Sequence, residues 1–112
     1  MTGTANQVDW AEQIKVRVNA EFDRVAGALA LAAARQTEAD RMDTLAVIAV
    51  LEDKRAEVMR NEQAGYFIHD WQELDNQVRR MILQDTRYKT IKANQELADK
   101  SHKSNSTGGY TA

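Results

Sequence analysis

The sequence predicts an all-α protein: an antiparallel helical hairpin joined by one or two shorter C-terminal helices. The chain of 112 residues has no proline and only five glycines, so it lacks the frequent turns of β-sandwiches and barrels. Alanine, leucine, methionine, glutamate, glutamine, lysine and arginine are plentiful, and these residues favour helices. We expect a single helical domain over 1–100, because the length suits one domain and its core.

The first helix is expected at about 10–35. Apolar residues recur there at helical spacing and make one stripe: Trp10, Ile14, Val18, Phe22, Val25, Leu29 and Ala32. The second half of this helix also has small residues on its opposite face, at Gly27, Ala30 and Ala34. Small side chains let another helix approach closely.

The second helix is expected at about 38–63, with Thr37 as its N-cap. Whether residues 36–38 turn or continue as helix stays open, and this decides between a compact bundle and a rod. One face of the helix carries Met42, Leu45, Ala49, Ala56 and Met59, and a second face carries Val47, Leu51 and Val58. The centre, 45–51, is apolar on all sides and therefore needs neighbours on at least two. We expect Val47, Leu51 and Val58 at an interface or under the third helix.

Two further helices are expected at about 71–84 and 86–100, the last either separate or an extension of the third. Gly65 is a suitable residue to close the second helix, with 66–68 as an apolar connector. Residues 101–112 are polar, small and glycine-containing, which predicts a flexible tail that is disordered.

Both tryptophans stand in the frame D-W-x-E. Aspartate is a preferred N-cap, and a glutamate three residues later completes a capping box. The frames therefore predict that two helices start at these caps: Asp9 with Glu12, and Asp70 with Glu73. An internal duplication is rejected, because 9–25 and 70–86 share little beyond the frame itself.

The charge is unevenly spread. The net charge is -2, but residues 1–75 hold 8 basic and 14 acidic side chains, whereas 76–112 hold 7 and 3. A basic segment can contact phosphates, and its aromatic ring can stack on a base. The candidate contacts with nucleic acid or with an acidic partner are Arg79, Arg80, Arg87, Tyr88, Lys89 and Lys92. The competing interpretation is a solvated face that pairs with the acidic first and second helices.

Signals of catalysis are scarce. The chain has no cysteine and two histidines, and it contains no Glu-x-x-His, H-E-x-x-H, P-loop or G-x-G-x-x-G pattern. His69 and Glu73 are four residues apart and could share a metal, but a residue beside a helix cap is expected to face solvent. We therefore expect no enzyme activity, no catalytic residue, no metal and no cofactor, with a small enzyme or metal site near His69 as an alternative.

The sequence predicts a cytoplasmic protein that works by protein–protein contact. Its start lacks a signal-peptide pattern, and the apolar run at 25–34 is shorter than the roughly 20 residues that span a bilayer. Excess apolar surface on long helices predicts self-association or docking to another protein, as an assembly subunit, an adaptor or a small inhibitor of the kind common among phage and plasmid products. The expected interface holds Val47, Leu51, Val58, Gly27, Ala30 and Ala34. The alternative is a nucleic-acid-associated protein that uses 79–92.

Overall fold

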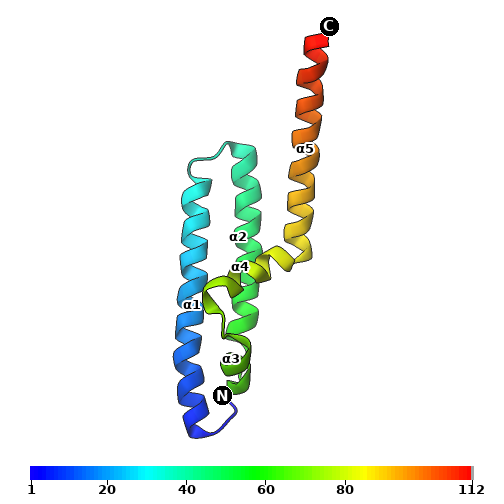
Figure 1. Cartoon of the computed structure of the whole chain (residues 1–112). Coiled ribbons are helices and arrows are strands. Elements are labelled where there is room, and N and C mark those ends of the chain that lie inside the picture. The colour runs from blue at the N-terminus through cyan, green and yellow to red at the C-terminus, as the bar shows by residue number, and fades with distance from the viewer. Residues whose placement is uncertain (112) are drawn as a thin grey trace.

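The all-α prediction is confirmed by the computed structural model, which describes the backbone of residues 1–111 and the side chains of 1–98. Within these residues the chain forms five helices: α1 (Ala5–Ala33), α2 (Glu38–Met59), α3 (Ala64–Asp70), α4 (Leu74–Gln84) and α5 (Thr86–Thr111). Figure 1 shows α1 and α2 as a long antiparallel pair, with α3 and α4 against it and α5 rising beside α2. The molecule is elongated, with extents of 73 × 23 × 19 Å.

The turn between α1 and α2 settles the question left open by the sequence. The chain leaves α1 after Ala33 and enters α2 at Glu38, where the Thr37 hydroxyl accepts a hydrogen bond from the backbone N–H of Asp40. This cap is the one predicted. The two helices therefore fold back on each other as a hairpin and do not form a continuous rod (Figure 1).

The first helix begins earlier than expected. Thr4 is its N-cap: the Thr4 hydroxyl accepts from the Gln7 N–H, and the Gln7 side chain accepts from the Thr4 N–H. This reciprocal capping box satisfies two backbone groups of the first turn. The preceding residues are held in place because Thr2 pairs with Glu62 and Ala64, through Thr2 N–H to Glu62 O at 2.6 Å and Ala64 N–H to Thr2 O at 2.9 Å.

The prediction that the D-W-x-E frames cap two helices is wrong at both sites. Asp9 and Glu12 lie inside α1, because the Thr4 box starts that helix first. Asp70 is the last residue of α3, and Glu73 is the N-cap of α4 without a side-chain cap hydrogen bond. The two tryptophans consequently differ. Trp10 is 57% exposed, whereas Trp71 is buried in the core.

The predicted connector at 66–68 is also wrong, because these residues belong to α3. Gly65 lies in the first turn of α3, and α2 ends earlier, at Met59. The helix expected at about 71–84 corresponds to α4 (Leu74–Gln84), which begins three residues later because a break at 71–73 separates it from α3. The apolar side chains of α3 explain why 64–70 is helical and not a connector. Ala64 and Phe67 are fully buried against α1, and this burial stabilises the short helix.

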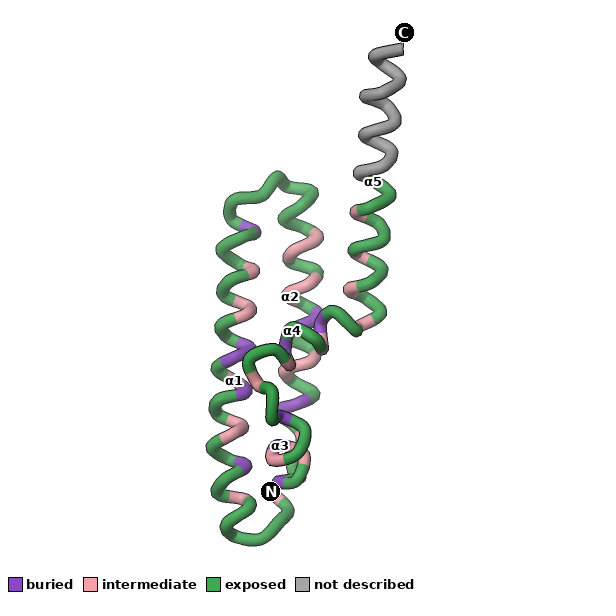
Figure 2. The backbone as a smooth tube through the Cα atoms, in the orientation of Figure 1, coloured by how far each residue is buried: buried purple, intermediate pink, exposed green. Residues whose placement is uncertain are grey.

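The core lies between the hairpin and the two short helices. Figure 2 places the buried segments on the facing sides of α1 and α2 and beneath α3 and α4. The buried cluster consists of Ala11, Val18, Phe22, Leu51, Val58, Ala64, Phe67, Trp71, Val78 and Ile82. Every helix from α1 to α4, together with the 71–73 break, supplies at least one member, so the core joins segments distant in sequence.

The tail predicted at 101–112 falls where the structure describes no side chains, and residue 112 lies outside the described residues, so flexibility there stays a prediction. The fourth predicted helix corresponds to α5, which starts after Asp85 as expected.

Among the described residues, no helix is both long and apolar enough to cross a membrane.

Replacing Leu51 with Asp tests the core. Leu51 is fully buried, so an aspartate there would lie unpaired in an apolar site, and we expect it to reduce the free energy of unfolding by about 4 kcal/mol or more. Leu31→Asp is the matched control on the neighbouring helix α1, because Leu31 is 70% exposed. Denaturant titration of dilute protein measures both. Equal stabilities for the two variants would contradict the packing described.

Candidate interaction surfaces

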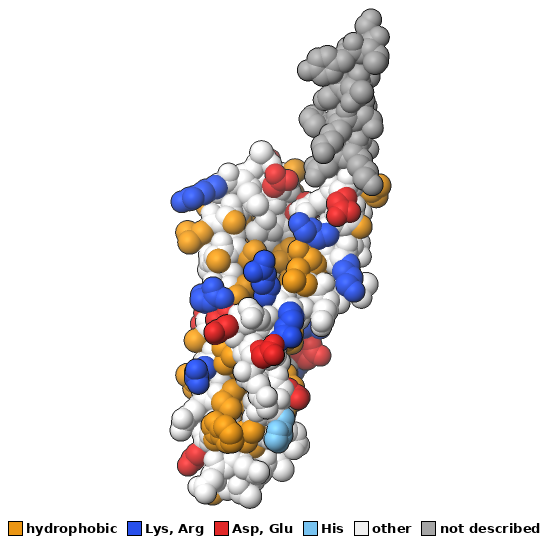
Figure 3. Space-filling view, in the orientation of Figure 1, with side chains coloured by type: hydrophobic (Ala, Val, Ile, Leu, Met, Phe, Trp, Pro, Cys, Tyr) orange, Lys and Arg blue, Asp and Glu red, His pale blue; other side chains and the backbone are white. Residues whose placement is uncertain are grey.

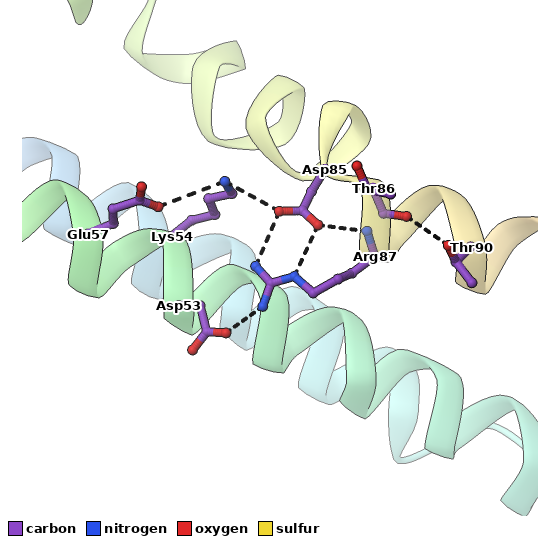
Figure 4. A network of polar contacts seen from close by, with 7 residues as sticks. All are labelled: Asp53, Lys54, Glu57, Asp85, Thr86, Arg87 and Thr90. Carbon is purple, nitrogen blue, oxygen red and sulfur yellow. Dashed lines mark hydrogen bonds and ion pairs between the residues drawn. The ribbon is translucent and has the colours of Figure 1, made fainter.

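An ion-pair network fixes the joint between α4 and α5. Asp85 lies between these helices, and its carboxylate accepts from Arg87 at 3.1 Å (Nε to Oδ1) and 3.2 Å (Nη2 to Oδ2). The same guanidinium donates to Asp53 on α2 through Nη1 at 2.5 Å. Lys54, also on α2, places Nζ 3.3 Å from Asp85 Oδ2. Figure 4 shows the four side chains converging on the gap between α2 and the joint.

Electrostatics hold the Asp85 carboxylate in its charged form. The hydrogen bond from the Arg87 guanidinium is the largest cause that lowers the pKa of Asp85, and it outweighs the opposing effect of desolvation. The backbone N–H of Arg87, 2.8 Å from Asp85 Oδ1, lowers it further and caps the first turn of α5. In return, Asp85 and Asp53 raise the pKa of Arg87. The network therefore attaches α5 to α2.

The predicted basic segment does not form one surface. Arg87 belongs to the network at the joint, and Arg80 pairs with Glu73 at 2.5 Å. Tyr88 is half-buried and packs against the core. The other three cations are exposed: Arg79, Lys89 and Lys92. The interpretation that this segment pairs with acidic groups of the chain thus fits Arg80 and Arg87. Of these two, only Arg87 contacts the second helix, α2, through its pair with Asp53.

A groove lies where the hairpin meets α4 and the start of α5, and we name it the front groove. Its volume is about 440 Å³, and its residues are Arg24, Val25, Ala28, Leu29, Val47, Asp75, Asn76, Arg79, Ile82, Leu83 and Tyr88. Figure 3 shows hydrophobic side chains gathered where α2, α4 and the first turns of α5 meet, with basic side chains on either side. The groove thus combines aliphatic walls with charged side chains at Arg24, Arg79 and Asp75.

The expected interface residues divide into two groups. Leu51 and Val58 are buried in the chain's own core, where α4 also packs, and Val47 is half-buried and lines the front groove. The sequence predicted that these residues lie either at an interface or under the third helix, and the structure places them near that helix, α4. The small residues Gly27, Ala30 and Ala34 are exposed on α1. Open space lies where a Cβ at Gly27 would be, so none of the described residues packs there.

The other apolar face of α2 is exposed from Met42 to Ala56, whereas Met59 at its end packs against the core, and sequence reasoning missed this exposure. Met42 is 64% exposed and Leu45 is 51% exposed, and Ala49 is exposed one turn further on. Glu38 and Glu52 stand at the two ends of the same face, so we name these five residues the outer row of α2. Both apolar faces were visible in the sequence, but the periodicity could not show which of them the single chain covers.

The residues considered for catalysis line a shallow polar hollow. His69, Asp70 and Glu73 lie there, all exposed, in a space of about 410 Å³. Glu73 is paired with Arg80, and the backbone oxygen of Asp70 accepts from the Gln77 side chain. In the part of the chain that the structure describes, no three His, Cys, Asp or Glu side chains are grouped so as to hold a metal ion.

Replacing Asp85 with Asn tests the network at the joint. Because the folded chain lowers the pKa of Asp85, its carboxylate stabilises the fold above an ordinary aspartate pKa of about 4, and this contribution is lost as the pH falls below that value. We expect Asp85→Asn to cost on the order of 1 kcal/mol at neutral pH and progressively less in acid. Asp53→Asn, at an exposed carboxylate, is the control and should cost less. A pH-independent loss for Asp85→Asn would rule out the electrostatic explanation.

Comparisons with models of known protein families, with curated proteins and with solved structures found no match. A proposal for the function of this chain therefore depends on its surfaces. Among the described residues, the apolar and accessible surfaces around α2 are the front groove and the outer row, and α1 also exposes Trp10, Val16 and Leu31.

Proposed function

We propose that this chain is a non-enzymatic helical protein that works through protein–protein contact, and that it self-associates. The observation that carries the proposal is the outer row of α2, where Met42 and Leu45 remain accessible although the other apolar face of the same helix is closed by the core. An exposed apolar row on a helix marks an interaction site.

The total surface of the chain supports the same proposal. Its accessible area is 7808 Å². A compact monomer of 12.6 kDa has roughly 6200 Å² by the usual scaling with mass. The elongated shape of the molecule accounts for the direction of this difference, because a long body has more surface than a compact one of the same mass. Association with a further copy would bury part of this area.

The contacts of the basic segment favour protein contact over nucleic-acid binding. Arg80 and Arg87 are engaged with carboxylates of the same chain, so they would have to exchange these partners for phosphates. Arg79, Lys89 and Lys92 remain exposed and keep the alternative testable. A small enzyme would place its chemistry in the hollow near His69, where Glu73 and the Asp70 backbone already have partners within the chain.

Light scattering coupled to size exclusion tests this function. We expect a mass above the 12.6 kDa of one chain, increasing with protein concentration, because an apolar contact closes the exposed row. The mass should persist at high salt and should not change when duplex DNA is added.

A nucleic-acid binder would behave differently. Its mass would rise only when DNA is present, and the complex would dissociate steeply with salt, because each phosphate contact releases counterions. That result, or the mass of one chain at every concentration, would contradict the proposed self-association. Lys89→Glu with Lys92→Glu is the matched variant, because both residues are exposed outside the front groove, and it should weaken a DNA complex but leave self-association unchanged.

A further inference from the structure

We propose that copies of this chain associate head to tail, with the outer row of α2 of one copy seated in the front groove of the next. This inference rests on the proposed self-association and deepens it, because it names the two surfaces in contact. The two surfaces differ in shape: one is a ridge of side chains on a helix, and the other is a groove with aliphatic walls.

The outer row has the spacing of a helix that docks into a groove. Met42, Leu45 and Ala49 stand at i, i+3 and i+7, so their side chains project from one side of α2. All three are exposed in the single chain. The front groove offers Val25, Leu29 and other aliphatic side chains as its walls, and its volume of about 440 Å³ is in the range of ordinary binding pockets.

The charges of the two surfaces are complementary. The outer row carries two acidic side chains, Glu38 and Glu52, and no basic one. The charged side chains that line the front groove are Arg24, Arg79 and Asp75, so its lining has a net charge of +1. An acidic helix would therefore be guided to this groove and a basic one disfavoured.

A chain cannot seat its own outer row in its own front groove. Val47 lines the groove and Leu45 belongs to the row, and residues two apart lie about 200° apart around a helix. The two surfaces therefore face away from each other on the same α2. Each copy can contact one neighbour through its row and a second through its groove. Such a contact continues from copy to copy until a ring closes or a filament grows.

Mixing two variants tests this arrangement. The row variant is Leu45→Glu, and the groove variant combines Arg79→Glu with Leu83→Glu, all at exposed positions. Each variant alone loses one of the two surfaces. We expect its self-association to weaken about tenfold or more, so that its mass in light scattering stays near 12.6 kDa. An equimolar mixture still pairs one intact row with one intact groove. We expect it to form a species of two chains and nothing larger.

Leu97→Glu is the matched control, because Leu97 is a 63% exposed leucine outside both surfaces, and it should keep the wild-type mass. Melting curves on dilute protein check that each variant folds. If a glutamate variant melts lower, Leu45→Ala and Leu83→Ala replace it, and their mixture should associate more tightly than either alone.

Three outcomes would overturn the head-to-tail contact. They are a mixture that stays single-chain, variants that keep the wild-type mass, and a row variant and groove variant that each form a dimer alone. A wild-type oligomer with any of these results leaves the proposed self-association intact and removes only this contact. A wild-type chain that never exceeds 12.6 kDa removes both.

Discussion

The packing of α4 across the α1–α2 hairpin is the contact on which the rest of the structure depends. Val78 and Ile82 of α4 close the core over Phe22 and Leu51, and Trp71 packs its ring 6.1 Å from that of Phe22. Hydrophobic burial at this crossing fixes the place where α4 ends. It therefore fixes the position of the joint with α5, which the ion pairs then hold on α2. The front groove follows from the same crossing, because its walls come from the hairpin on one side and from α4 and α5 on the other.

The second helix serves three environments at once. One side packs on α1, a second meets α4 and α5, and a third carries the exposed outer row. A single chain of this size has too few helices to cover the third side. Charged residues in the middle of the third side would be typical of a solvated helix face. Met42, Leu45 and Ala49 make the middle of this side apolar instead. Covering it by another copy explains this pattern without requiring any new element of the fold.

Much of the fold could be predicted from local patterns, and the failures have identifiable causes. The hairpin, its Thr37 cap and the burial of Leu51 and Val58 follow from helical periodicity and capping chemistry. The predicted cap at Asp9 failed because a capping box at Thr4 and Gln7 lies upstream, and pairing of Thr2 with the segment after α2 holds that start in place. The predicted cap at Asp70 failed because α3 already runs through this residue. The front groove could not be predicted, because it depends on where α4 crosses the hairpin. The periodicity of apolar residues within one helix does not predict where another helix crosses it.

The oxidation rate of Met42 tests the central claim most directly. The thioether of Met42 is exposed in one chain, so dilute peroxide should convert it quickly to the sulfoxide. Met59 is only partly exposed and packs against the core of its own chain, which makes it an internal reference. Mass spectrometry of peptides can follow both as the protein is concentrated. If another copy covers the outer row, Met42 oxidation slows in step with the assembled fraction while Met59 keeps its rate. An unchanged Met42 rate in fully assembled protein would contradict the account.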